Sequence, residues 1–287
     1  IQTVIDNHQH TILKHGSEFR SVSILQRLLL HHPKWPKIQS LLTSGSRWPL
    51  TPISDNDRQV KNTELISRGN HKSAIMHAKI LTDTLIKEVN QGWMVPIPTS
   101  FINKIKNAEV APVGIAQQWQ AHEDGSRALK YRLTHDQSFE ASIGYSVNAR
   151  VEKDKLDELH YGHSLNRIIH YIVSTRIQLP TTKILLAKTD LKAAYRRITL
   201  HGDTAARCII TTGDIALLSL RLTFGGTPCP NEFCVMSEMI ADLANDILHC
   251  PEWNPIELNS PHTISLPLER DSSDISPFLP GKELDVD

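Results

Sequence analysis

Two predicted β-hairpins, one on each side of a helical segment, restrict most strongly what this chain can fold into. In residues 110–136, two strand-like runs flank a turn signal, His122-Glu-Asp-Gly-Ser126. In residues 206–224, two apolar runs flank Gly213-Asp214. Short loops of this kind join antiparallel neighbours, whereas parallel strands need long crossovers. The expected fold class is therefore α+β with an antiparallel sheet and flanking helices, and a parallel doubly wound sheet is disfavoured.

Helical patterns surround the two hairpins. Apolar residues recur at intervals of three and four in four segments, which are residues 24–29, 61–90, 153–178 and 231–250. Pro33 and Pro36 are expected to break any helix between the first two segments, and residues 49–60 resemble a linker. Further extended segments are expected at residues 92–98, where two prolines oppose a helix, and at residues 183–191, an apolar run of strand type.

Composition and charge exclude several classes of protein. The four cysteines lack a CxxC spacing, so neither a zinc ribbon nor a disulfide framework is indicated. No apolar run approaches the roughly 20 residues of a membrane helix, and no signal peptide pattern is present. We therefore expect an intracellular protein, in cytoplasm or nucleus, without a membrane partner; its oligomeric state is not indicated. GxGxxG and Walker motifs are also absent, which disfavours the ordinary dinucleotide and P-loop classes.

The charge is unevenly distributed although its sum is zero. Residues 1–100 carry twelve Lys and Arg against seven Asp and Glu, and residues 101–200 carry fifteen against ten. Residues 201–287 reverse the sign, with four against fourteen. A basic first two thirds suits a surface that meets phosphates, although ordinary surface charge gives a similar excess.

A carboxylate follows an apolar run at Asp190, within the sequence Lys188-Thr-Asp-Leu-Lys-Ala-Ala-Tyr-Arg-Arg197. By itself, an aspartate in this position most often caps a turn or faces solvent. Asp190 with Tyr195 five residues later resembles the first palm motif of reverse transcriptases. The resemblance implies that Asp190 and the carbonyl of Leu191 bind the catalytic Mg²⁺ ions. It also implies that Tyr195 lies beneath the sugar of the incoming nucleotide, where a plain core aromatic is the simpler interpretation.

A glycine turn before the last helical segment resembles a second motif of the same family. Leu222-Thr-Phe-Gly-Gly-Thr-Pro-Cys-Pro-Asn-Glu-Phe233 is similar to the family's Phe-Gly segment that ends in Pro-x-x-Phe. The resemblance places Phe224 and Gly225 at the nucleotide. Glycines permit a close backbone approach to a template base, and the prolines favour the start of a helix. A purely structural turn is the alternative.

The second strand of the first hairpin carries the third motif. Lys130-Tyr-Arg-Leu-Thr-His-Asp136 resembles the fingers segment Lys-x-Arg-x-x-x-Asp of reverse transcriptases. Arg132 would then lie against the triphosphate, because a guanidinium matches phosphate oxygens, and Lys130 would add a second phosphate contact. The alternative is a surface strand with alternating charges.

The three motifs occur in the order of the family, and the resemblance extends over roughly residues 60–260. It implies a retrotransposon RNA-directed DNA polymerase that binds an RNA or DNA template with its primer, deoxynucleoside triphosphates and Mg²⁺. Its right-hand fold would be incomplete. The expected regions are an N-terminal helical and linker region (1–60), a fingers-like region with a leading helix (61–180), a partial palm (181–250) and an irregular acidic tail (251–287).

One departure from the family limits the expected activity. The family carries an aromatic-x-Asp-Asp motif, but no adjacent Asp-Asp pair occurs in this sequence, and residues 283–287 do not fit it. We therefore expect a chain that stops before this motif and is inactive alone, from a parent enzyme that transfers nucleotides with two metal ions. A non-catalytic retroelement remnant that binds nucleic acid or a partner is the first alternative. An unrelated helical interaction protein is the second.

Overall fold

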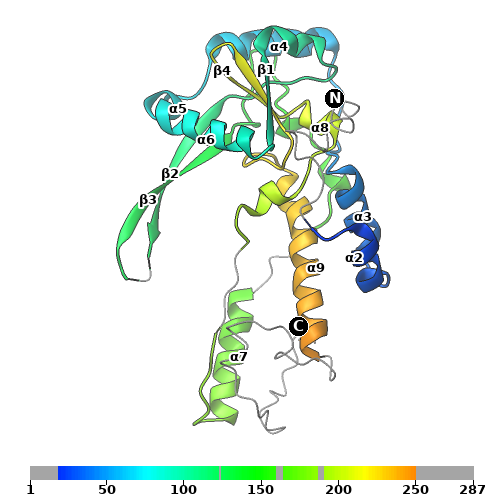
Figure 1. Cartoon of the computed structure of the whole chain (residues 1–287), viewed down its shortest axis with the longest axis vertical. Helices are drawn as coiled ribbons and strands as arrows, with labels where there is room; N and C mark the ends of the chain where they lie inside the picture. The colour runs from blue at the N-terminus through cyan, green and yellow to red at the C-terminus, as the bar shows by residue number, and fades with distance from the viewer. Residues whose placement is uncertain (1–18, 123, 160–163, 187–190, 250–287) are drawn as a thin grey trace. The chain divides into compact units, whose positions relative to one another are not determined.

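A computed structural model describes residues 19–122, 124–159, 164–186 and 191–249. Two antiparallel sheets form the frame of its first compact unit, which comprises residues up to 158 and residues 192–235 (Figure 1). Three strands make the first sheet in the order β1-β5-β4; they are β1 (Met94–Pro98), β4 (Ile209–Thr212) and β5 (Ile215–Ser219). The second sheet is a hairpin of β2 (Val113–Ala121) and β3 (Arg127–His135). The expected α+β class with antiparallel strands is confirmed.

Both predicted hairpins are present with the expected turns. Strands β2 and β3 pair from Val113 opposite His135 to Ala121 opposite Arg127. Gly213 has φ +56° in the turn between β4 and β5, which a glycine adopts at little cost. Strand β1 is also found where an extended segment was expected. Its two prolines are tolerated because β1 lies at an edge of the sheet, where a missing backbone donor breaks no second ladder.

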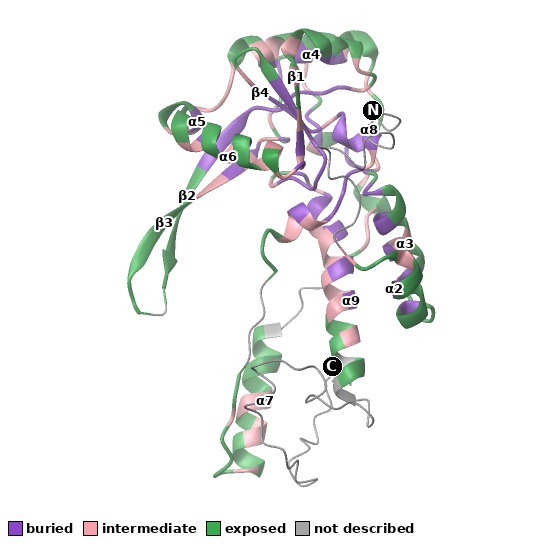
Figure 2. Ribbon diagram, in the orientation of Figure 1, coloured by how far each residue is buried: buried purple, intermediate pink, exposed green. Residues whose placement is uncertain are grey.

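The three-stranded sheet is buried on both faces. Side chains of α5 (Lys72–Met76), α6 (Ala78–Asn90) and the hairpin pack on one face, in a cluster of Ala74, Leu81, Leu85, Met94, Val113, Ile115, Leu133, Ile210 and Leu217. Side chains from α4 (Asp55–Arg68) and the connecting segments pack on the other face, in a cluster of Leu65, Ile102, Ala108, Val110, Ala141, Ile209, Ala216 and Leu218. Figure 2 shows this core, and it shows the far half of the hairpin as exposed.

The N-terminal helices correct two expectations. Helices α2 (Val22–Leu29) and α3 (Trp35–Ser44) follow one another, and Pro36 lies in the first turn of α3 rather than breaking it. Proline is tolerated there because a first-turn N–H has no helical partner to lose. The predicted linker 49–60 was wrong in its second half, because α4 (Asp55–Arg68) begins inside it. The Ser54 hydroxyl caps α4 by accepting from the N–H of Asp57 at 3.1 Å.

The predicted helix over residues 61–90 consists of three helices instead of one. Helix α4 ends at Gly69, and α5 (Lys72–Met76) and α6 (Ala78–Asn90) follow. The chain leaves the helical path because the segment at Asn70 and His71 bonds to the start of β2. The Val113 N–H donates to Asn70 Oδ1, and the His71 N–H donates to the Val113 carbonyl, both at 3.0 Å.

Short helices connect the remaining strands of this unit. They are η1 (Thr99–Lys104), η2 (Asn148–Arg150), η3 (Lys153–Lys155), η4 (Ala194–Arg197) and α8 (Gly202–Ala205). Helix α9 (Cys229–His249) confirms the last predicted helix, with Pro230 in its first turn. Val235, Met236 and Met239 are buried on it.

The second compact unit comprises residues 159–191 and residues from 236 onward. Its helix α7 (Ser164–Gln178) begins later than the expected start at residue 153, because residues 153–155 form η3. Residues 183–186 form no strand, which corrects that expectation; no strand of the described chain pairs with them. Residues 187–190 and the acidic tail lie outside the described residues, and the expected division into four regions stays a prediction. No helix in the described part is long and apolar enough to cross a membrane.

Candidate functional site

Aromatic rings from three separate segments meet in the first unit. The ring of Tyr195, on η4, stacks on that of Phe224 with centroids 4.9 Å apart and planes 27° apart. Phe233, at the start of α9, lies at 5.5 Å from Tyr195 in a tilted arrangement. Offset stacking of this kind stabilises aromatic pairs by about 0.5–1.5 kcal/mol beyond their burial. The first two rings belong to different sequence motifs, so the fold brings these motifs together.

A guanidinium from the hairpin joins this aromatic cluster. The Arg132 Cζ atom lies 5.9 Å from the centroid of the Phe224 ring. Arg132 is half-buried, and no ion pair or hydrogen bond to it occurs within the described chain; its Nε is buried without an acceptor. A partly desolvated cation without a counter-charge is costly, and an anion would relieve that cost. Lys130, two residues earlier on β3, is fully exposed to solvent and lies on the same face of the strand.

The glycine turn lies directly against the end of β3. Gly225 has φ +135°, and a Cβ atom there would lie 1.8 Å from the carbonyl oxygen of His135. The His135 N–H in turn donates to the Phe224 carbonyl at 2.7 Å. Only glycine fits a position of this kind. The turn therefore approaches its own hairpin, which is the purely structural role named as the alternative, and the place of Gly225 at a nucleotide stays a prediction.

The second glycine of the turn packs against buried side chains. A Cβ atom on Gly226 would lie 2.3 Å from the Trp48 ring and 2.7 Å from Gln137 Oε1. The same Gln137 oxygen accepts from the Thr223 hydroxyl at 3.0 Å, and its amide nitrogen lies 3.1 Å from the sulfur of Cys208. These contacts hold the turn against buried side chains of the first unit.

The imidazole of His135 lies beneath the site as a neutral group. It is 2% exposed, and neither ring nitrogen has a hydrogen-bond partner in the part of the chain that the structure describes. Burial lowers the pKa of His135 well below the ordinary range, and the nearby Arg196 charge acts in the same direction. A second proton is therefore disfavoured on this ring while the protein is folded.

Arg196 anchors the segment that carries Tyr195. Its Nε lies 3.1 Å from a carboxylate oxygen of Glu88 on α6, and its Nη1 donates to Ser219 Oγ at 3.0 Å and to the Leu222 carbonyl at 3.1 Å. Burial raises the pKa of Glu88, and the Arg196 charge opposes that rise. The residue that follows Tyr195 thus ties η4 to the sheet.

Asp136, the last residue of the fingers-like motif, holds the base of the hairpin. One of its carboxylate oxygens lies 2.8 Å from Nε2 of His71, and the other accepts from the Ser138 N–H at 3.2 Å. His71 therefore has a role at the base of the hairpin, together with its neighbour Asn70. That role is structural, since the same segment also bonds to β2.

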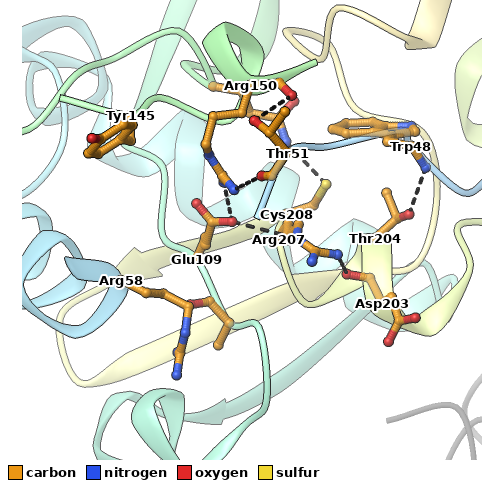
Figure 3. Close-up of polar contacts among 12 residues, drawn as sticks. Trp48, Thr51, Arg58, Glu109, Tyr145, Arg150, Asp203, Thr204, Arg207 and Cys208 are labelled. Carbon is orange, nitrogen blue, oxygen red and sulfur yellow. Dashed lines mark hydrogen bonds and ion pairs between the residues drawn. The ribbon is translucent and has the colours of Figure 1, made fainter. Parts of the chain in front are cut away.

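A buried charge cluster, which sequence reasoning missed, supports the site from further away (Figure 3). Glu109 is fully buried and pairs with Lys61 Nζ at 2.7 Å, with Arg150, and with Arg207 at 3.6 Å. Burial lowers the pKa of Lys61, and Glu109 opposes that shift. Arg150 also donates to the Thr51 carbonyl at 2.9 Å. The cluster therefore holds η2 in place. Its members are far apart in the sequence, so no local pattern signals it.

The predicted Mg²⁺ ligands, Asp190 and the carbonyl of Leu191, are not joined by further metal ligands in the described structure. Asp190 lies outside the described residues, and Leu191 begins the next described segment with an exposed side chain. Within the described ranges, no group of three or more His, Cys, Asp or Glu side chains is arranged to hold a metal ion. The expected Mg²⁺ site therefore has no carboxylate set here to test it.

The structure thus brings together Arg132, Tyr195, Phe224 and Gly225, and leaves Lys130 exposed on the same hairpin face. No protein-family model matches the sequence, and no curated protein matches it either.

Proposed function

We propose that this chain is part of an RNA-directed DNA polymerase of the reverse transcriptase type, and that its first unit binds a primer–template and a deoxynucleoside triphosphate. The observation that carries the proposal is the meeting of Arg132, Tyr195 and Phe224. Each comes from a different motif of the resemblance, and nothing in the sequence required these segments to fold against one another.

The chemistry of each group suits that role. Arg132 offers to a triphosphate a half-buried guanidinium that has no ion pair within the described residues, and Lys130 adds an exposed cation on the same face of the strand. Tyr195, held by its ring contacts and by the anchoring of Arg196, would lie beneath the sugar and oppose a 2′-hydroxyl by its bulk. The partners proposed are an RNA or DNA template, a primer and deoxynucleotides, and the setting proposed is cytoplasm or nucleus.

Catalysis is proposed for the parent enzyme and not for this chain alone. In the parent, Asp190 and the carbonyl of Leu191 would hold Mg²⁺, which stabilises the attacking and leaving oxygens of phosphoryl transfer. The described residues supply no matching carboxylates, and the sequence holds no adjacent Asp-Asp pair. The residues of this chain bind and orient; we assign them no step of bond formation.

The absence of an Asp-Asp pair favours a second candidate function, a remnant that binds nucleic acid without chemistry. The two candidates share the binding surface and differ in the nucleotide. A polymerase site selects a deoxynucleotide, whereas a binding remnant has no reason to do so.

Binding of a primer–template across a salt series tests what both candidates share. Log K should fall linearly with log salt, because bound phosphates release their counterions. Arg132→Ala should lower that slope by about one. Arg27→Ala removes an exposed arginine from α2 and should leave the slope unchanged. Absent or salt-insensitive binding by the natural chain would contradict both candidates.

A further inference from the structure

Asn148 on η2 holds the glycine turn through both ends of its carboxamide. Its Nδ2 donates to the Gly225 carbonyl at 2.7 Å, and its Oδ1 accepts from the Thr227 N–H at 2.8 Å. Nδ2 also donates to Ser138 Oγ at 2.8 Å, and the Asn148 N–H donates to the Gln137 carbonyl at 3.0 Å. One half-buried side chain thus connects the end of the hairpin, η2 and the turn.

Two other asparagines use the same arrangement for structural purposes. Asn62 bonds to the carbonyl of Ala108 and the N–H of Val110. Asn70 bonds to the carbonyl of Thr211 and the N–H of Val113. Both tie a helix or loop to the sheet. Asn148 differs because the backbone it holds belongs to the turn beside Arg132 and Phe224.

Most backbone carbonyls of the turn have a hydrogen-bond partner among the described residues, whereas two of its N–H groups do not. The Phe224 carbonyl accepts from His135, the Gly225 carbonyl from Asn148, and the Gly226 carbonyl from the N–H of Cys229 at 3.1 Å. The N–H groups of Gly225 and Gly226 have no acceptor within the described chain. Gly226 is a buried residue, and buried N–H groups without a partner are rare in folded proteins. These two donors are therefore candidates for a ligand oxygen.

The surroundings specify the chemistry of that ligand. The turn directly follows Phe224, whose ring centroid lies 5.9 Å from Arg132 Cζ, and no counter-charge to Arg132 occurs among the described residues. Two adjacent backbone donors and a nearby guanidinium match an oxyanion that has several oxygens. A phosphate group fits this description. The proposed function supplies phosphates from two sources, the strand backbone and the nucleotide.

We propose that Asn148 is a positioning residue that sets the turn from Gly225 to Thr227 so that the N–H groups of Gly225 and Gly226 bind a phosphate group beside Arg132. The inference rests on the proposed function and adds the residue that prepares its phosphate site. Asn148 does not itself touch the phosphate. It bonds to the Gly225 carbonyl and the Thr227 N–H, and it leaves the N–H groups of Gly225 and Gly226 available to a ligand.

The test compares Asn148→Ala, Asn62→Ala and Arg132→Ala in the whole chain, with a fluorescent primer–template and no nucleotide, at four salt concentrations. If the site serves the strand, Asn148→Ala should weaken binding about tenfold, because the turn would no longer hold its hydrogen bonds to a charged group in place. Its salt slope should equal that of the natural chain, since neutral N–H donors displace no counterions. Arg132→Ala should instead lower the slope. Asn62→Ala removes a more deeply buried amide and should leave affinity unchanged.

Displacement of the primer–template by inorganic tripolyphosphate distinguishes the two phosphate sources. If the site serves the strand, Asn148→Ala weakens duplex binding and leaves the tripolyphosphate constant unchanged. If the site serves the nucleotide, Asn148→Ala raises the dissociation constant for tripolyphosphate and leaves duplex binding unchanged. If Asn148→Ala and the natural chain have equal dissociation constants for the primer–template and for tripolyphosphate, the inference is overturned and the proposed function stays intact. No binding by the natural chain would instead remove the proposed function.

Thermal unfolding and the active fraction of each variant separate positioning from loss of structure. Asn148→Ser, whose hydroxyl can serve only one side of the turn, replaces Asn148→Ala if the alanine variant does not fold. A loss of affinity in either variant at a full active fraction supports the positioning role. A loss explained entirely by a lower active fraction, with a normal dissociation constant, contradicts it.

Discussion

At the scale of single residues, the candidate site is a set of side chains whose partners are few. Among the described residues, Arg132 has an aromatic neighbour and no counter-charge, and the ring of His135 has no hydrogen bond. The motifs identified Arg132, Tyr195 and Phe224 in advance, because each stands in a recognisable pattern. Asn148 and Glu109 were missed, because the turn that Asn148 holds lies 77 to 79 residues away and Arg150 lies 41 residues from Glu109, so neither contact leaves a local signal.

The buried His135 makes stability depend on pH. Its folded pKa is lowered by burial, whereas in the unfolded chain it is about 6.5. The unfolded state therefore binds the extra proton as pH falls through that value, and the folded state does not. The stabilising contribution of the neutral His135 should be fully present above pH 6.5, and the free energy of unfolding should decrease below that pH. His135→Leu should flatten this part of the curve, measured by urea denaturation between pH 5 and 7.5.

A matched histidine separates this effect from general acid sensitivity. His122 is exposed at the turn of the hairpin, so His122→Gln should leave the slope of the unfolding free energy unchanged. A slope in His135→Leu equal to that of the natural chain would show that His135 is protonated in the folded state, against the account given above.

At the scale of elements, periodicity located the strands and helices but not their breaks. The hairpins, β1, α2 and α9 lie where the patterns indicated, because local turns and apolar spacing determine them. The break at Gly69 and the late start of α7 were not visible in the patterns. The former exists because Asn70 and His71 bond to β2, a contact made only after folding. The expected strand over 183–191 lacks a pairing partner for its described residues.

Asn70 should hold the start of β2 in a way that hydrogen exchange can measure. Asn70→Ala removes the acceptor of the Val113 N–H, so exchange at Val113 should accelerate, and stability should fall by about 1–3 kcal/mol. The Ile115 N–H donates to Ser73 and should remain protected. Asn56→Ala, at an exposed position of α4, serves as the control. Unchanged exchange at Val113 would contradict the assignment of this contact.

At the scale of the whole molecule, the proposed nucleotide site depends on assembly of the first unit. Arg132 comes from the hairpin, Tyr195 from η4 and Phe224 from the segment after β5, and none of these segments can form the site alone. Under the proposed function, selection between a deoxynucleotide and a ribonucleotide would be a property of the folded unit. Such selection would distinguish a polymerase site from a surface that merely attracts phosphates.

The most direct test is the binding of dATP and ATP, with Mg²⁺, to the complex of this chain with a primer–template whose next template base is thymine. The natural chain should bind dATP more tightly than ATP, and Tyr195→Ala should bring the two dissociation constants together. Tyr145→Ala, which removes a half-exposed tyrosine of the same unit, should preserve the difference. Equal binding of dATP and ATP by the natural chain would contradict the proposed polymerase site.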